Sequence, residues 1–150
     1  MSAYIQNRKA YADFEFLDTF EAGLELFGHE VKSLKKGQGS LRGAYIIVRG
    51  REAYLVGATI PPYQVSNMPH GYDEARPRRL LLSQKELIRL AQVGNLRGLT
   101  IVPVSVYNRR KKLKLEIAIV RRRKKYDKRE VLKKRAAVRD ISRTIKRVSE

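Results

Sequence analysis

The alternation of apolar and polar residues is clearest over residues 112–120. Apolar side chains occupy every second position there, which is typical of a strand that buries one face. These positions are Leu113, Leu115, Ile117 and Ile119. Residues 100–107 are also rich in β-branched side chains, and 108–111 would form the turn between the two strands. The pattern therefore predicts a β-hairpin over 100–120.

The first half of the chain also reads as mostly extended. Apolar runs at 44–48 and 53–60 predict a pair of strands, with Gly50 and Arg51 as their turn. Residues 11–17 alternate aromatic with acidic side chains, and we expect them to be extended as well. Residues 61–79 hold four of the five prolines and predict a long surface loop, a kind of segment that is often functional.

Two short helices interrupt the strands. Ser83 and Glu86 have the spacing of a capping box, and apolar residues follow at helical spacing, so we expect a helix over 84–92. Residues 28–35 predict a second helix. The sum is a mainly β fold of about six short strands with two or three short helices outside them. In a small basic protein this favours an oligonucleotide-binding (OB) type of β-barrel, although a ribosomal-type α+β sandwich stays open.

Charge divides the chain into two parts. The 150 residues carry 33 Lys and Arg against 15 Asp and Glu, a net charge of +18, and residues 121–150 alone hold 14 basic and 4 acidic groups. We therefore expect a barrel body over 1–120 and a basic tail over 121–150. Such an excess favours RNA or DNA as the partner over an acidic protein or a membrane surface.

The tail also has an apolar stripe at helical spacing. Its members are Val131, Val138, Ile141, Ile145 and Val148. Crowded like charges weaken an isolated helix, so we expect the tail to be disordered alone and helical against RNA.

The sequence gives little support for catalysis. It has no Cys, its two histidines lack the spacing of a zinc site, and no phosphate-binding or nucleophile motif occurs. We therefore expect no enzyme activity, metal or cofactor. Acidic residues from Asp13 to Glu21 could hold Mg²⁺ in a nuclease, but a solvated edge strand is the better interpretation. The lack of a long apolar run predicts a soluble cytoplasmic protein, which we expect to be a monomer without a membrane partner.

Four segments, in order, resemble one family. Residues 7–10 read NRKA, 20–35 read FEAGLELFGHEVKSLK, 78–82 read RRLLL and 124–129 read KKYDKR. Together they are similar to the motifs of the SmpB family, the SsrA (tmRNA)-binding proteins, over essentially the whole chain. The resemblance departs at Arg123, where the family usually has Gly.

The resemblance implies an OB-type barrel that binds the tRNA-like domain of tmRNA. Such a protein would deliver alanyl-tmRNA to 70S ribosomes stalled without a codon, and would meet elongation factor Tu indirectly through alanyl-tmRNA. Its tail would sense the empty mRNA channel beside small-subunit rRNA. The alternative that we keep open is a structural ribosomal protein with a basic extension.

The resemblance also implies two sets of RNA-binding residues. The set for tmRNA is Asn7, Arg8, Glu21, Glu30, Lys32, Leu80, Leu81 and Lys114. The set for the ribosome is Lys124, Lys125, Tyr126, Asp127, Lys128 and Arg129, to which we add Ile141 and Ile145 of the apolar stripe. Tyr126 would stack on an unpaired base, as aromatic side chains do in RNA recognition.

Overall fold

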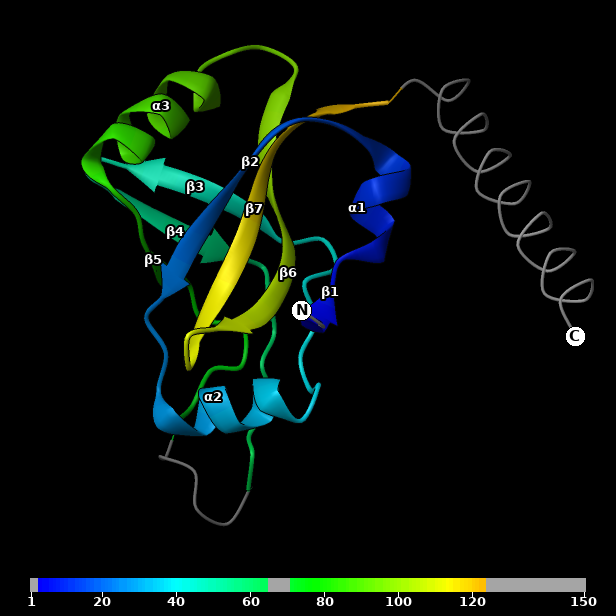
Figure 1. Ribbon diagram of the computed structural model, residues 1–150, viewed down its shortest axis with the longest axis vertical. Helices are drawn as coiled ribbons and strands as arrows, with labels where there is room; N and C mark the ends of the chain where they lie inside the picture. Colours follow the sequence, from blue (N-terminus) through cyan, green and yellow to red (C-terminus); the bar gives the residue numbers. More distant parts are fainter. Residues whose placement is uncertain (1–2, 65–70, 124–150) are drawn as a thin grey trace, which may run out of the picture.

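The computed structural model describes residues 3–64 and 71–123, which form seven strands and three helices (Figure 1). In chain order they are β1 (Ala3–Gln6), α1 (Arg8–Asp13), β2 (Phe14–Leu24), α2 (Gly28–Lys35), β3 (Tyr45–Arg49), β4 (Glu52–Val56), β5 (Arg78–Leu81), α3 (Gln84–Gly94), β6 (Leu99–Arg109) and β7 (Lys112–Arg122). The predicted hairpins are β3–β4 and β6–β7. The predicted helices are α2 and α3. Because strands make up most of the elements, the predicted mainly β class is confirmed.

The strands form one antiparallel sheet in the order β1-β6-β7-β2-β5-β4-β3. No hydrogen-bonded ladder joins the end strands β1 and β3 within the described residues, so the sheet does not close. It nevertheless curls until β3 lies next to β6, with α2 across one end and α3 beside the other (Figure 1). The result is a partly open barrel, broadly consistent with the OB type.

Two apolar cores hold this arrangement together. The larger lies inside the curl, where Leu34 of α2 and Leu90 of α3 pack against strand residues. The smaller lies between α1 and the outer face of β6 and β7, and consists of Ala10, Val102, Val104, Ala118 and Val120. These two strands are therefore buried on both faces over much of their length, which fits their long apolar runs.

The prediction of an extended chain over 11–17 is wrong for its first three residues. Helix α1 ends at Asp13, and β2 begins at Phe14. The helix is stabilised by tertiary contacts rather than by its own propensity: Ala10 is buried in the smaller core, and Tyr11 stacks on Phe16 with ring centroids 4.8 Å apart. A helix of six residues is too short to reveal itself by periodicity.

The capping box of α3 forms as the sequence predicts. The Ser83 hydroxyl accepts a hydrogen bond from the Glu86 N–H at 3.2 Å, and the Glu86 carboxylate accepts one from the Ser83 N–H at 3.1 Å. We expect the Ser83→Ala variant to lose about 1 kcal/mol of unfolding free energy, since an orphan N–H of the first turn loses its acceptor. Urea denaturation would measure this, and a loss below about 0.3 kcal/mol would show that water replaces the cap.

Candidate nucleic-acid interface

The tip of the β6–β7 hairpin carries an uncommon turn. The strands pair as far as Arg109 and Lys112, so the turn consists of Arg110 and Lys111 alone, and the predicted four-residue turn is wrong. Both turn residues have positive φ, 52° and 66°. Two-residue hairpins require this conformation and usually obtain it with Asn-Gly. Two long cations in strained positions make the tip a candidate functional site.

A hollow of about 340 Å³, which we call the lysine hollow, lies beside this tip. Its basic side chains come from three places in the sequence: Lys35 from α2, Lys111 from the turn, and Lys112 and Lys114 from β7. Its apolar lining includes Leu81 of β5, whose side chain is 51% exposed. A concave site with exposed apolar surface and several cations suits RNA, which offers phosphates and the faces of bases together.

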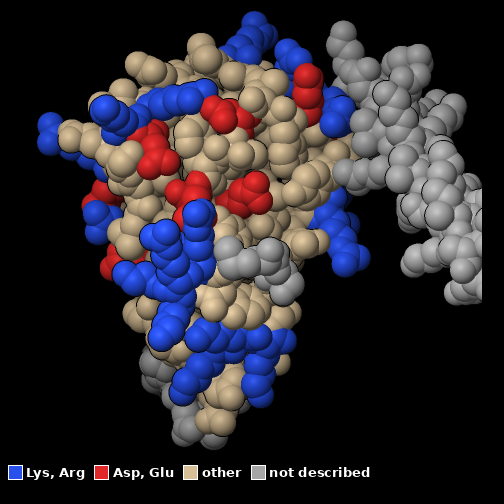
Figure 2. All heavy atoms as spheres, in the orientation of Figure 1, with Lys and Arg blue, Asp and Glu red and all other residues tan. Residues whose placement is uncertain are grey.

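The residues that line the lysine hollow carry an excess of positive charge, and the nearby Glu21 acts on Lys114 alone among these lysines. None of its lining residues is acidic, and every ion pair among the described residues uses an arginine. Figure 2 shows Lys and Arg side chains gathered over the hairpin tip and over α2 below it. Like charges this close repel one another unless a polyanion lies between them, which makes the hollow a candidate anion-binding surface.

Helix α2, which supplies Lys35, is anchored by the buried carboxylate of Glu30. One carboxylate oxygen accepts hydrogen bonds from Nε and Nη2 of Arg78, at 3.1 and 2.8 Å, and from the Tyr72 hydroxyl at 3.0 Å. The other accepts the N–H of Phe27 at 2.8 Å and a hydrogen bond from Arg76. Glu30 and Arg78 are both 0% exposed. The helix is thereby fixed to the start of β5.

The same contacts decide the protonation state of this cluster. Burial raises the pKa of Glu30, but the hydrogen bonds from Arg76, from the N–H of Phe27 and from Arg78 outweigh it and lower the pKa to about 2. Burial and the Glu30 carboxylate raise the pKa of Tyr72 to about 12. The cluster therefore holds a carboxylate and a neutral phenol at neutral pH, which fits a structural anchor.

Comparison with known proteins agrees with this basic, partly open barrel. The family model described as "SmpB: SmpB protein" matches residues 4–147. The chain belongs to the SmpB family. An SsrA-binding protein of Rubrobacter xylanophilus is 44% identical over 147 residues, which are 97% of each chain. One of Thermosipho africanus is 42% identical over 148 residues, 98% of this chain and 99% of that protein.

A solved structure supports the same assignment. It is described as "tmRNA-SmpB: a journey to the center of the bacterial ribosome", has 38% sequence identity and a TM-score of 0.67, and the match covers 80% of this chain and 84% of that one. The resemblance inferred from the four sequence segments is therefore confirmed.

The residues that the SmpB resemblance assigns to tmRNA differ in how far they are exposed to solvent. Asn7, Glu30 and Leu80 are buried, whereas Arg8, Lys32 and Leu81 are exposed, and Glu21 and Lys114 are half-buried. Only Leu81 and Lys114 of this set line the lysine hollow. Their role in RNA binding stays a prediction.

The three buried members stabilise the SmpB fold. The Asn7 side chain donates to the carbonyl of Pro103 at 2.9 Å, and its backbone N–H donates to the carbonyl of Val104 at 2.7 Å. Leu80 is part of the larger core, and Glu30 fixes α2. Any effect of these three on RNA would therefore act through the fold that presents the exposed residues.

The acidic residues of β2 are spread along the strand and paired. Glu15 lies 2.6 Å from Arg121, Asp18 lies 2.5 Å from Arg89, and Glu21 bonds both Tyr107 and Arg109. In residues 3–64 and 71–123 no group of three or more metal-binding side chains comes together, which gives the nuclease hypothesis no support. No helix in that part of the chain is long and apolar enough to cross a membrane.

Sequence reasoning missed Lys35 as a member of a cationic site. The sequence predicts Lys35 only as part of a helix, whereas Lys111 and Lys112 belong to a basic hairpin tip that is at least as compatible with an RNA phosphate contact as with a solvated turn. The run of four cations over 109–112 was the available signal. What the sequence could not show is that β5 and α2 bring Leu81 and Lys35 to the same place.

Arg123 connects the body to the tail. Its N–H donates to the carbonyl of Asp13 at 2.9 Å, and its Nε donates to the carbonyl of Phe14 at 3.0 Å. Strand β7 also continues through Arg122, two residues beyond the predicted end of the body. Arg123 is therefore bound to the start of β2, where a Gly would lack the side-chain bond. The tail residues assigned to the ribosome, from Lys124 to Ile145, lie outside the described residues.

Proposed function

We propose that this protein binds the tRNA-like domain of tmRNA and acts in trans-translation. The observation that carries the proposal is the lysine hollow, a concave surface lined by four lysines and no acidic residue on a barrel of the SmpB family. The names of the relatives, SsrA-binding proteins, and the tmRNA-SmpB description of the solved structure support tmRNA as the partner.

The barrel body and the basic tail have different roles in this proposal. The barrel grips folded RNA through phosphates at the lysines and apolar contact at Leu81, and the complex enters ribosomes stalled without a codon. Elongation factor Tu is met through alanyl-tmRNA. The tail, with its basic residues and apolar stripe, occupies the empty mRNA channel beside small-subunit rRNA. The protein works as a cytoplasmic monomer and as a binding factor, without a reaction, metal or cofactor of its own.

Removing two cations from the lysine hollow tests this assignment. We expect Lys112→Ala with Lys114→Ala to weaken binding to the tRNA-like domain of tmRNA about tenfold near physiological salt. The slope of log affinity against log salt should fall by roughly 1.4–1.8, because two phosphate contacts are lost. Filter binding across a salt series would measure both quantities.

A matched control removes the same charge elsewhere. Lys85 and Arg97 are exposed and line no part of the lysine hollow. Replacing both with Ala should change the affinity less than about twofold, because removing charges far from the bound phosphates costs little beyond screened attraction. Equal losses in the two double variants would show that the protein attracts RNA by net charge alone and would remove the lysine hollow from the proposal.

A further inference from the structure

Three consecutive arginines at the end of β7 all attach to the junction between α1 and β2. The Nη2 atom of Arg121 lies 2.6 Å from a carboxylate oxygen of Glu15. The guanidinium of Arg122 lies 5.9 Å from the centre of the Phe14 ring, and Nε of Arg123 donates to the Phe14 carbonyl at 3.0 Å. We call these three side chains the arginine clasp. Because adjacent cations repel one another, their common attachment needs an explanation.

The clasp begins where β7 loses one of its two neighbouring strands. Strand β6 starts at Leu99, which pairs with Arg121, so among the described residues only β2 pairs with β7 beyond that point. A strand end that is held on one side tends to fray. Here the pairing with β2 continues through Arg122, and the N–H of Arg123 donates to the Asp13 carbonyl at 2.9 Å. The clasp therefore holds the one-sided end of β7 in place.

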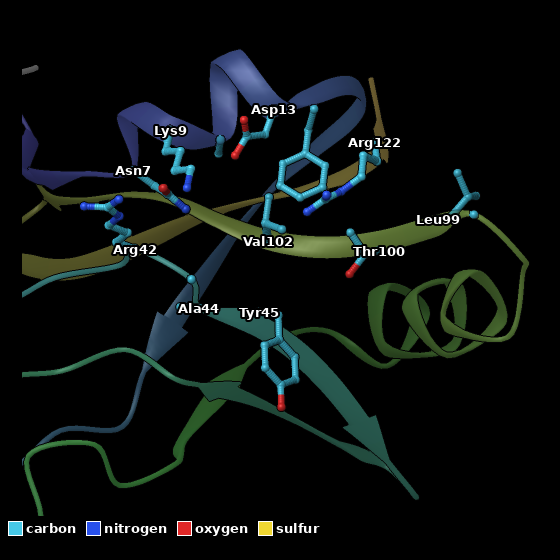
Figure 3. Close-up of a pocket in the computed structure, with 14 residues that line it drawn as sticks. Asn7, Lys9, Asp13, Arg42, Ala44, Tyr45, Leu99, Thr100, Val102 and Arg122 are labelled. Carbon is cyan, nitrogen blue, oxygen red and sulfur yellow. The ribbon is translucent and has the colours of Figure 1, made fainter. Parts of the chain in front are cut away.

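Arg123 also caps helix α1. The last carbonyls of a helix have no partner within the helix, and arginine side chains can satisfy them. Asp13 is the last residue of α1 and Phe14 is its C-cap, and the carbonyls of both accept hydrogen bonds from Arg123. Figure 3 shows that Asp13, at the end of α1, and Arg122, at the end of β7, line the same hollow. The end of β7 is thereby fixed to the end of a helix.

That helix is itself firmly attached to the body. Ala10 of α1 is 2% exposed and belongs to the smaller core. Asn7, which precedes the helix, donates its side-chain N–H to a carbonyl of β6 at 2.9 Å. The arginine clasp therefore connects the body–tail joint to a packed part of the barrel rather than to a loop.

An ordered joint has a consequence for binding. Each backbone residue that becomes fixed on binding lowers the affinity by roughly five- to thirtyfold, because its conformational freedom is lost. A joint that is ordered before binding avoids this loss. The residue at the joint therefore affects how tightly the tail binds, even when it touches no partner.

We propose that the arginine clasp fixes the direction in which the basic tail leaves the body, with Arg123 as its positioning residue, so that barrel and tail reach the mRNA channel already aligned. The inference rests on the proposed function and adds to it a role for the joint. This chain aligns its tail through a bound arginine at the position where the family usually has Gly.

A nitroxide label in the free protein tests the clasp itself. The chain has no Cys, so Lys125→Cys gives a single labelling site two residues beyond Arg123. Arg123→Ala should shorten the rotational correlation time of this label about twofold, because the joint gains backbone freedom. Lys85→Ala, which removes an exposed cation at the start of α3, should leave the spectrum unchanged. Equal spectra for Arg123→Ala and for the labelled chain with Arg123 intact would overturn the inference.

Binding of the unlabelled full chain to vacant small ribosomal subunits tests the alignment. Arg123→Ala should weaken this binding about fivefold near physiological salt, the lower end of the loss from ordering one residue. The slope of log affinity against log salt should change by less than about 0.2, because no phosphate contact is lost. Affinity for the tRNA-like domain of tmRNA should change less than about twofold, which also shows that the variant is folded. Lys85→Ala should leave both affinities unchanged.

A second variant releases the joint without touching the clasp. Two glycines inserted between Arg123 and Lys124 leave all three arginines in place but free the direction of the chain that follows. The insertion should weaken binding to the subunit by a similar factor. Combining it with Arg123→Ala should add less than about twofold, since both changes remove the same alignment.

Three results on the subunit would overturn the inference. A salt slope lowered by roughly 0.7–0.9 in Arg123→Ala would show that Arg123 itself contacts a phosphate. Unchanged or tighter binding of Arg123→Ala would show that alignment contributes nothing, and fully additive losses in the combined variant would show that the two changes act separately. Failure of the proposed function is distinct, because the unmodified protein would then not prefer tmRNA while the label spectra stayed as expected.

Discussion

Replacing Glu30 with Gln should lower the free energy of unfolding by about 3–5 kcal/mol, the cost of leaving a buried charge without its partner. The side chains of Glu30 and Arg78 are both 0% exposed and lie 2.8 Å apart. The variant would leave the Arg78 guanidinium in the interior with neutral acceptors alone, the carbonyls of Ala58 and Glu74, the Tyr72 hydroxyl and the new amide oxygen. Urea denaturation at neutral pH would measure the loss.

Glu74→Gln is the matched control. Glu74 is exposed on the loop that precedes β5, so the change should stay within about 0.5 kcal/mol. A loss below about 1 kcal/mol in Glu30→Gln would contradict the buried ion pair as the anchor of α2.

The same ion pair makes stability depend on pH. The folded-state pKa of Glu30 is about 2, below its ordinary value of 4.5, so the carboxylate contributes stability above pH 4.5 that is lost as the pH falls through 2. The difference in unfolding free energy between the unmodified protein and Glu30→Gln should therefore shrink across this window. A difference that stays constant from pH 7 to pH 2 would mean that folding leaves the pKa of Glu30 unchanged, against the lowered value expected here.

Glu30→Gln also decides how this residue affects RNA. If Glu30 acts through the fold, the variant should bind the tRNA-like domain with near-normal affinity at a temperature where it is fully folded. A large loss of affinity without loss of stability would instead show that Glu30 contacts tmRNA directly, as the family resemblance implies. The cluster of Glu30, Tyr72, Arg76 and Arg78 would then have to open when the RNA binds.

Ending the chain after Arg123 should leave tmRNA binding nearly intact and abolish tagging of stalled peptides. The removed residues carry 11 basic and 4 acidic groups and the apolar stripe. The affinity for the tRNA-like domain should change by less than about threefold at roughly 200 mM salt, where nonspecific phosphate attraction is weak. Tagging in a reconstituted translation system should fall to background, because nothing would occupy the empty mRNA channel.

The position of the cut matters for this experiment. A cut after Val120 would also remove the pairing of Arg121 with Glu15 and of Arg122 with Phe14, as well as the bonds of Arg123. We expect that shorter chain to lose stability as well as tagging, so the cut after Arg123 isolates the tail. Loss of tRNA-like domain binding in the chain that ends at Arg123 would contradict the separation of body and tail.

Much of this fold was predictable because its signals are local. The alternation over 112–120 gave β7, the Ser83 capping box gave α3, and Gly50 with Arg51 gave the β3–β4 turn. Helix α1 was missed because its stability comes from Ala10 packing against β6, a contact across more than ninety residues. The Arg110–Lys111 turn was misread because its sequence lacks the Asn-Gly pattern that the conformation favours.

The candidate site was less predictable than the fold. The family resemblance assigned both Leu80 and Leu81 to RNA binding. In β5, however, Leu80 is buried in the core and Leu81 is exposed, because neighbouring strand residues face opposite sides of the sheet. The partnership of Glu30 with Arg76 and Arg78 joins residues that are 46 and 48 positions apart. Such contacts leave no local pattern, and the lysine hollow depends on contacts of this kind.

The most direct test of the central claim compares tmRNA with ordinary tRNA. The affinity of the full chain for the tRNA-like domain of tmRNA and for an unrelated tRNA should be measured across a salt series. Both affinities should fall with salt, since both RNAs present phosphates. A tmRNA-binding factor of the SmpB family should keep its preference for the tRNA-like domain at every salt concentration, whereas equal affinities throughout would contradict the account.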